Sequence, residues 1–263
     1  MIYFIFAMKA EAQPFIEKLG LKKNTAYRRM DVFGDENSAV AITGTGILRA
    51  AMSVTELLST MEISKSDILV NVGICGMKSN PDGKENIGDA YICNSIISCY
   101  DGRTYYPDML YRTPFDEGRL VTVNKPEDGE KYRDACDSRA VTLVDMEAAG
   151  VYEAAIRFMN SDRISFIKIV SDMCDGRYPK PDEVPDITGR HANEIIKWAD
   201  EVHGFRKKDV GMELSTAEKE WINEVADRHR YSVTRREMLK RKVMYSKVTG
   251  ADITKEYIEN IIR

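Results

Sequence analysis

Short apolar runs alternate with amphipathic stretches along most of the chain. The apolar runs have the length of β-strands and lie at 2–6, 38–43, 67–72, 90–98, 119–123, 140–144 and 164–170. Apolar positions recur with helical spacing at 8–19, 47–61, 146–159 and 188–202. Strands that alternate with helices are typical of an α/β fold, so we expect three layers, with a central mixed, largely parallel sheet flanked by helices.

Glycines punctuate this pattern. Gly20 is expected to end the first helix, because glycine readily takes the left-handed conformation found there. Gly44-Thr45-Gly46 predicts a turn before the second helix, and the glycines of 73–76 predict a turn that closes strand 67–72. The segment 100–118 holds many aromatic residues and two prolines without a clear period, which predicts a long loop.

The C-terminal part of the chain differs in charge from the rest. The whole sequence has a net charge of −4, but 205–263 holds 14 basic and 10 acidic residues, a net +4. The first 204 residues therefore hold 24 basic and 32 acidic residues, a net −8. We predict a catalytic domain over 1–204 and a C-terminal helical extension over 205–263, which begins with a polar linker at 205–212.

Helical signals continue through this extension. Ser215 and Glu218 have capping-box spacing, and Trp221 lies on the apolar face that follows. The basic stretch Arg235–Lys242 favours a solvated helix face, and contact with nucleic acid is the alternative that its charge leaves open.

Composition excludes several classes of protein. The chain is 43% hydrophobic, yet its apolar runs fall far short of the roughly 20 residues that span a bilayer, and we expect no signal peptide. The five cysteines include no C-x-x-C pair and the three histidines are scattered, so neither a disulfide framework nor a zinc site is expected. These features favour a reducing, cytoplasmic setting.

Two acids stand where ligands bind in open α/β sheets. Glu147 follows the strand 140–144, and Asp172 follows the strand 164–170. An acid in such a place is often only the cap of the next helix. Two carboxylates in different surroundings can instead take different protonation states and different catalytic roles.

The residues around these acids resemble the nucleoside phosphorylase and nucleosidase superfamily, whose motifs are Met-Glu-Ala and, later, Ser-Asp. Met146-Glu147-Ala148 and Ser171-Asp172 match them. The resemblance implies that Asp172, oriented by Ser171, protonates the purine ring. It implies that Glu147 accepts hydrogen bonds from the ribose hydroxyls and that Met146 packs on the sugar.

The start of the chain resembles the 5′-methylthioadenosine/S-adenosylhomocysteine nucleosidases, in which Ala-Met precedes an acidic stretch. The last acid of that stretch polarises the attacking water, and it falls on Glu11. Lys168 stands where these nucleosidases carry an Arg near the water. The resemblance also implies that Thr45 lies near the 5′ group of the bound nucleoside. The backbone at Gly73 can approach a ligand closely, because glycine has no side chain.

Superfamily phosphorylases differ at positions that bind phosphate. Their opening Gly-Asp-Pro stretch is absent here, and Asn71 and Ile74 replace an Arg and a Ser. Ile74 also departs from the nucleosidases. These differences favour water over phosphate as the nucleophile.

We therefore expect hydrolysis of a purine nucleoside, a 5′-modified adenosine such as methylthioadenosine, S-adenosylhomocysteine or 5′-deoxyadenosine, with release of adenine, as in methionine salvage. A phosphorylase and a catalytically silent nucleoside-binding regulatory protein are the alternatives. The resemblance implies a homodimer or larger assembly, with 100–118 as an interface element, and base contacts near 124–128. No cofactor, metal, membrane or nucleic-acid partner is expected.

Overall fold

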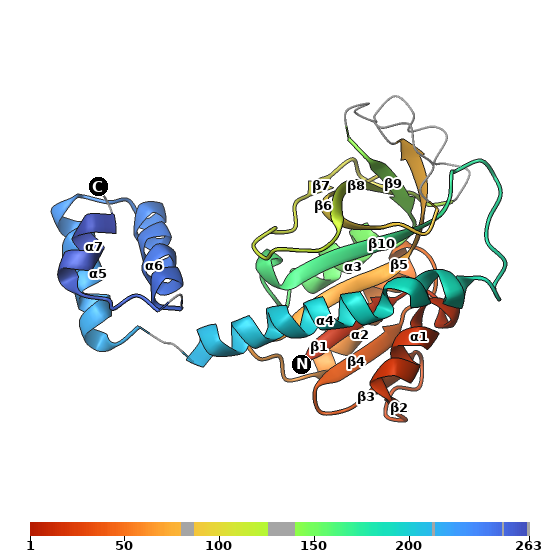
Figure 1. Ribbon diagram of the computed structural model, residues 1–263, viewed down its shortest axis with the longest axis horizontal. Coiled ribbons are helices and arrows are strands. Elements are labelled where there is room, and N and C mark those ends of the chain that lie inside the picture. The colour runs from red at the N-terminus through yellow and green to blue at the C-terminus, as the bar shows by residue number, and fades with distance from the viewer. Residues whose placement is uncertain (80–86, 126–139, 212–213, 249, 262–263) are drawn as a thin grey trace. The chain divides into compact units, whose positions relative to one another are not determined.

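A mixed β-sheet forms the centre of the N-terminal part of the chain (Figure 1). Its strands are β1 (Ile2–Phe6), β2 (Lys22–Lys23), β3 (Asp31–Gly34), β4 (Ser38–Ile42), β5 (Ile68–Ser79), β6 (Ala90–Ser98), β7 (Thr104–Tyr105), β8 (Asp116–Thr122), β9 (Thr142–Asp145) and β10 (Ile164–Asp172). The helices are α1 (Lys9–Leu19), α2 (Ile47–Thr60), α3 (Ala148–Ala155), α4 (Val184–Gly211), α5 (Thr216–Arg228), α6 (Val233–Val248) and α7 (Lys255–Ile261).

The computed structural model describes residues 1–79, 87–125, 140–211, 214–248 and 250–261. These residues divide into two units, Met1–His203 and Gly204–Arg263. Within the described ranges, no helix is both long enough and apolar enough to cross a membrane.

The sheet combines parallel and antiparallel pairs of strands. Neighbouring strands follow the order β10-β6-β8-β9-β5-β1-β4-β3-β2, and β10 also pairs with β5. The pairs β1–β4, β1–β5, β5–β10, β6–β8 and β8–β9 are parallel. The pairs β2–β3, β3–β4, β5–β9, β6–β7 and β6–β10 are antiparallel. The sheet is mixed as expected, but it is not largely parallel, because among the described strands antiparallel pairings are as frequent as parallel ones.

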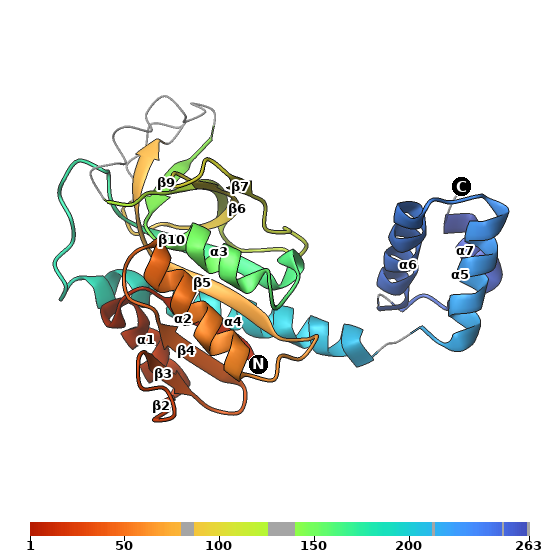
Figure 2. The same ribbon diagram turned by 180° about the vertical axis from the view of Figure 1, so that it is seen from behind.

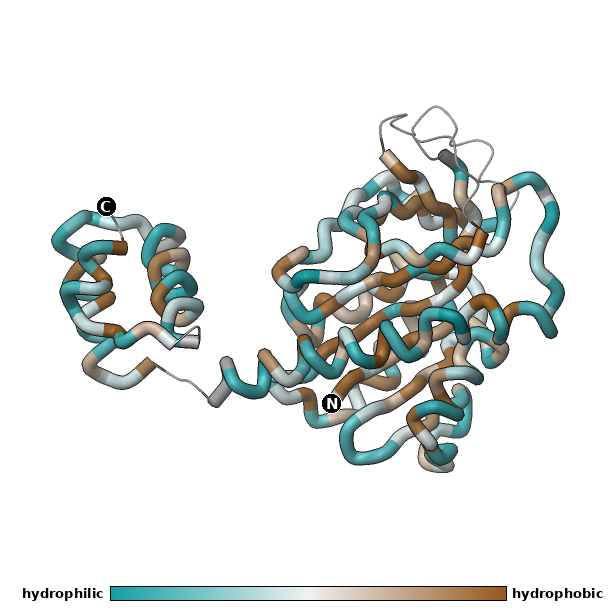
Figure 3. Tube along the Cα trace, viewed as in Figure 1, coloured by the Kyte–Doolittle hydropathy of each residue, from teal (hydrophilic) through white to brown (hydrophobic). Residues whose placement is uncertain are grey.

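Helices cover both faces of this sheet, which confirms the expected layered α/β architecture (Figures 1 and 2). The helices α2 and α3 pack on the face that carries Tyr3, Ile5 and Phe166. The helix α1 and the first part of α4 pack on the opposite face, which carries Phe4 and Ile167. Figure 3 shows the hydrophobic residues running along the strands between these helices. Alternate residues of each strand point to opposite faces, so two apolar layers form on one sheet.

Several predicted boundaries are wrong. The strand β5 runs through 73–76 to Ser79, so the predicted turn there is part of a strand. The helix α3 is shorter than predicted, and the predicted loop 100–118 contains β7 and the start of β8. The helix α4 continues to Gly211, so most of the predicted linker 205–212 is helical.

The unit Gly204–Arg263 has an apolar core of its own. Ile222 and Val225 of α5 meet Leu239 and Val243 of α6 and Ile258 of α7. Ser215 caps α5 as its pattern predicted, because its side chain accepts a hydrogen bond from the N–H of Glu218.

A glycine sets how closely α2 and α3 approach each other. A Cβ atom on Gly150 of α3 would lie 2.3 Å from the carbonyl oxygen of Ile47 in α2. We expect Gly150→Ala to lower the free energy of unfolding by about 1–3 kcal/mol, since the helices must separate. Thermal and chemical denaturation measure this change.

Gly189 of α4 is the matched control for that experiment. A Cβ atom there would be 3.6 Å from Pro14, an ordinary contact. Gly189→Ala is expected to raise stability by about 0.5–1 kcal/mol, because alanine favours helix more than glycine does. Equal effects of the two substitutions would contradict the packing explanation.

Candidate active site

Glu11 lies in the first turn of α1 with its carboxylate buried. Its Oε2 accepts hydrogen bonds from the backbone N–H groups of Ala7 (3.1 Å) and Met8 (2.8 Å). Its Oε1 accepts one from the N–H of Ile74 in β5 (2.9 Å). Burial raises the pKa of Glu11, and the N–H donors and the charge of Lys168 offset only part of this effect.

Gly73 makes room for that carboxylate. A Cβ atom on Gly73 would lie 2.9 Å from Oε1 of Glu11, too close for any other residue without a shift. The glycine predicted as part of a turn therefore lies within β5 and lets the strand backbone pass close to an acid.

Glu147 occupies the N-cap position of α3, but it does not cap that helix with its side chain. Its Oε1 accepts a hydrogen bond from the N–H of Gly46 at the start of α2 (2.8 Å). Burial and then the negative charge of Asp145 raise the pKa of Glu147 to about 7, although Lys168 lowers it. The carboxylate therefore changes charge near neutral pH.

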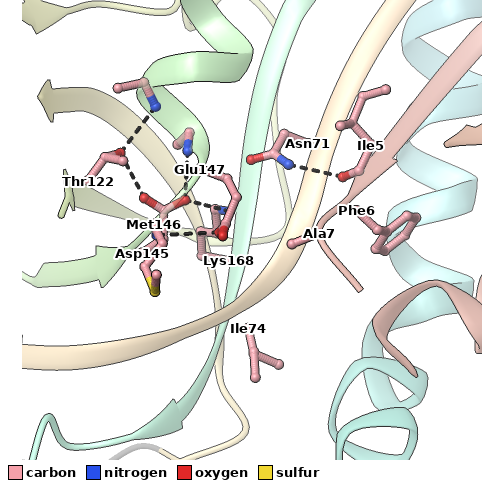
Figure 4. Close-up of polar contacts among 12 residues, drawn as sticks. Ile5, Phe6, Ala7, Asn71, Ile74, Thr122, Asp145, Met146, Glu147 and Lys168 are labelled. Atoms are coloured by element: carbon pink, nitrogen blue, oxygen red, sulfur yellow. Dashed lines mark hydrogen bonds and ion pairs between the residues drawn. The ribbon is translucent and has the colours of Figure 1, made fainter. Parts of the chain in front are cut away.

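Lys168 is buried, with 2% of its surface exposed, and its side chain lies beside Asp145 and Glu147 (Figure 4). Its Nζ forms an ion pair with Oδ2 of Asp145 at 2.9 Å. Burial alone would lower the pKa of Lys168, but the charges of Asp145, Glu147 and Glu11 outweigh burial and raise it. Lys168 is thus a permanent cation paired directly with a residue that the sequence analysis did not single out.

Asp172 ends β10, just past an irregularity in its pairing with β5. Its Oδ1 accepts a hydrogen bond from the N–H of Cys174 (3.0 Å), and its Oδ2 lies 2.8 Å from Oγ of Ser171. The Ser171 hydroxyl also lies 3.1 Å from the carbonyl oxygen of Cys75. The Ser171 hydroxyl has one proton, so it donates to one of these two acceptors at a time.

The strand β5 relates the two ends of the site. Glu11 packs against Gly73, and Oδ1 of Asp172 would lie 3.0 Å from a Cβ atom on Gly76. The two glycines are three positions apart, which is about 10 Å along a strand. The structure therefore brings Glu11, Gly73, Glu147 and Lys168 together, with Ser171 and Asp172 farther along β10.

The other predicted residues lie around this group. Met146 is half-buried and packs on a small apolar cluster with Val121, Val123 and Val144. Thr45 is exposed on the turn before α2. Of the region 124–128 predicted near the base, the positions from 126 onward lie outside the described residues.

Sequence reasoning missed Asp145 and Thr122. Asp145 Oδ1 accepts a hydrogen bond from the Thr122 hydroxyl (2.7 Å), and Oδ2 accepts one from the N–H of Ala148 (2.9 Å). The helix-capping role considered for Glu147 thus belongs to Asp145, so the Glu147 carboxylate is not used in capping α3. Across the described ranges, no three His, Cys, Asp or Glu side chains are grouped so as to hold a metal ion.

Comparison with known proteins gives one sequence relative and many structural ones. No protein-family model matches the sequence. A 5′-methylthioadenosine nucleosidase of Arabidopsis thaliana is 24% identical over 216 residues, which cover 69% of this chain and 78% of that protein. This sequence match agrees with the resemblance that the Met-Glu-Ala and Ser-Asp motifs predicted. Sequence and fold together support the resemblance to the nucleoside phosphorylase and nucleosidase superfamily.

Solved structures of nucleosidases share the fold. The apo structure of an Arabidopsis thaliana 5′-methylthioadenosine nucleosidase aligns with a TM-score of 0.62 and 22% identity, over 77% of this chain and 96% of that one. A futalosine hydrolase mutant of Helicobacter pylori aligns with a TM-score of 0.59 and 15% identity, over 76% and 98%. At these identities, the structures support the fold of the superfamily and leave the substrate to be argued from the site.

Proposed function

We propose that this protein hydrolyses the N-glycosidic bond of a 5′-modified adenosine, such as methylthioadenosine, S-adenosylhomocysteine or 5′-deoxyadenosine, and releases adenine. The sequence relative is named for 5′-methylthioadenosine. The observation that carries the proposal is the placing of Glu11 and Asp172 against Gly73 and Gly76 of one strand. These two acids are the candidate proton acceptor and proton donor of the reaction.

Each candidate residue has a role in this reaction. Asp172 donates a proton to the purine ring as the glycosidic electron pair moves onto the base. The sugar becomes an oxocarbenium-like cation, and water attacks it from the opposite face. Glu11 takes a proton from that water, and its raised pKa suits a group that must accept one. Glu147 accepts hydrogen bonds from the ribose hydroxyls, and Met146 packs on the sugar.

The charges of the site favour water over phosphate as the nucleophile. Three carboxylates, those of Glu11, Asp145 and Glu147, surround the single ammonium of Lys168, which already pairs with Asp145. A phosphate dianion would be repelled by this excess of negative charge. The Ile74 N–H is occupied by Glu11, and the buried side-chain amide of Asn71 donates to the carbonyl oxygen of Ile5 (3.0 Å). Neither residue offers phosphate the hydroxyl or the cation that Ser and Arg provide in the phosphorylases.

We expect base release from methylthioadenosine, or from another 5′-modified adenosine, to proceed in phosphate-free buffer. Chromatography of the free base and of the sugar product measures the reaction. Added phosphate should neither accelerate release nor yield a sugar 1-phosphate. A requirement for phosphate would show that the protein is a phosphorylase, and tight binding without turnover would support the regulatory alternative.

Assembly and domain roles remain predictions. All the candidate residues lie in Met1–His203, which supports catalysis by the predicted domain 1–204. The homodimer and the cytoplasmic location also remain predictions. In the expected interface segment 100–118, Phe115 is buried and Tyr105 stacks on Tyr152 of the same chain, while Tyr106 is 67% exposed.

A further inference from the structure

One buried ammonium is shared unequally among three carboxylates. Lys168 forms its ion pair with Asp145 at 2.9 Å, and the side chains of this pair are 2% and 1% exposed. The acids of Glu147 and Glu11 also act on Lys168 through their charge, without an ion pair to it within 4 Å in the described structure. Glu147 and Glu11, the two acids assigned to the substrate, thus lack the ion pair with Lys168 that Asp145 has.

Two hydrogen bonds hold the Asp145 carboxylate in the position where it forms its ion pair with Lys168. The Thr122 hydroxyl donates to its Oδ1, and the N–H of Ala148 donates to its Oδ2. The Thr122 oxygen in turn accepts a hydrogen bond from the N–H of Ala149 (3.1 Å), which fixes the direction of its proton. Every polar group that touches the Asp145 carboxylate is a donor, as an ionised carboxylate requires.

The strand register explains why Lys168 has a choice of partners. Lys168 of β10 pairs with Gly73 of β5, the residue against which Glu11 packs. Glu147 lies two positions after Asp145 along the chain, at the start of α3. An ammonium released by Asp145 would therefore remain under the charge of two carboxylates of the substrate site, those of Glu147 and Glu11.

We propose that Asp145 is a positioning residue, which pairs with Lys168 and so keeps the ammonium from pairing directly with Glu11 or Glu147. Those two carboxylates are thereby left to the attacking water and to the ribose hydroxyls. This inference rests on the proposed function for the roles of Glu11 and Glu147, but the charge arrangement itself does not.

The other groups that face the ammonium do not change this balance. Cys75 of β5 and Cys93 of β6 lie near Lys168, and burial raises the pKa of both thiols, so they stay neutral. Glu11 comes from α1, Asp145 from β9 and Glu147 from the start of α3, while Asp172 of β10 acts on Cys75. The site therefore holds more acids than cations, and the ion pair of Asp145 with Lys168 leaves Glu11 and Glu147 with backbone N–H donors but no direct cationic partner in the described structure.

The first test is Asp145→Asn, which keeps the shape and removes the charge. Lys168 is then expected to pair with Glu147 or Glu11, and the pKa of that acid should fall by about one unit or more, beyond the fall that loss of the Asp145 charge by itself causes at Glu147. Carbon-13 NMR titration of glutamate-labelled protein measures this without substrate. In the assay, the acid limb of the kcat/KM profile should move to lower pH, and the plateau should fall about 10-fold or more.

Thr122→Val is the matched control, because it removes the other side-chain contact of Asp145 without changing any charge. It is expected to leave the acid limb and the glutamate pKa values in place, even where it lowers the rate at every pH. The double variant Asp145→Asn/Lys168→Met removes both charges, and its glutamate pKa values should return toward those of the wild type. It also keeps the test available if Asp145→Asn alone folds poorly, since a buried pair can often be replaced as a unit.

The outcomes separate this inference from the proposed function. A folded Asp145→Asn protein with unmoved glutamate pKa values and an unmoved acid limb would overturn the positioning role. So would a shift of equal size in Thr122→Val. If the pKa values move as expected but the wild-type protein releases no base from any adenosine derivative, the charge arrangement stands and the proposed function fails.

Discussion

Replacing Asp172 by asparagine is expected to lower turnover about 10²-fold or more while nucleoside binding is largely kept. The asparagine oxygen can still accept the hydrogen bond from the Cys174 N–H, and its NH₂ group can donate to Ser171. The side chain therefore keeps its place but has no proton to give. Steady-state kinetics and calorimetric binding of a substrate analogue separate the two effects.

The leaving group offers a sharper form of this test. A riboside whose nitrophenolate departs without protonation does not need the proton from Asp172. Asp172→Asn should therefore lose much less activity on that substrate than on an adenine nucleoside. An equal loss on both substrates would indicate damage to the site rather than loss of a proton donor.

Asp175 supplies the control. It lies three residues farther on, is exposed, and pairs with Arg177 at 3.2 Å. Asp175→Asn is expected to leave kcat and KM unchanged, because this acid faces water. An Asp172→Asn protein with full activity on an adenine nucleoside would refute the assigned mechanism.

The sequence predicted the core strands and helices well because their apolar residues repeat with the period of each element. The turn predicted at 73–76 is wrong because glycine occurs both in turns and where another group approaches the backbone closely. At Gly73 and Gly76 it does not turn the chain but admits the side chains of Glu11 and Asp172 against a strand. Only the neighbouring elements distinguish these uses, and they come from distant parts of the sequence.

The prediction of a linker at 205–212 is wrong for a related reason. Lysine and arginine after Phe205 make the segment polar, but they are good helix formers, and α4 continues through them to Gly211. Polarity indicates exposure, and exposure does not end a helix. The short strands β2 and β7, two residues each, leave no periodic signal to detect.

The candidate acids could be found from sequence, but the division of work among them could not. Asp145 and Glu147 both stand where a strand meets a helix, and either could cap it. The choice depends on Lys168, which the parallel β5–β10 pairing brings in from a later strand. Motifs identify the residue types of such a site, while the electrostatics depends on strand register.

Glu147→Gln is expected to make the protein more stable at pH 8 and much less active. The pKa of Glu147 is about 7 in the folded protein, against an ordinary value of 4.5. Between these values the folded state binds the proton more tightly than the unfolded state, so stability falls as pH rises from 4.5 through 7. Above pH 7 the buried charge costs about 3 kcal/mol, from 1.36 kcal/mol per pKa unit.

Glutamine removes that charge and keeps an oxygen for the Gly46 N–H. Urea denaturation at pH 8 should therefore show a gain of about 2–3 kcal/mol, and the gain should shrink toward zero as the pH approaches 4.5. Activity should move the other way. Without a full carboxylate to accept the ribose hydroxyls, KM should rise and kcat should fall, together by about 10-fold or more.

Glu153 on the same helix is the comparison that gives this result its meaning. Its carboxylate is about one-third exposed and accepts hydrogen bonds from Arg103 and Tyr105. Glu153→Gln weakens those contacts, so it should lower stability slightly or leave it unchanged at both pH values. A gain at pH 8 that is confined to Glu147→Gln would mean that the fold retains an unfavourable buried charge at the position where the proposed reaction needs a carboxylate. An equal gain in both variants, or none in Glu147→Gln, would instead show that burial of the Glu147 charge does not destabilise the fold. The assignment of Glu147 as the acceptor of hydrogen bonds from the ribose hydroxyls would then lose its physical basis.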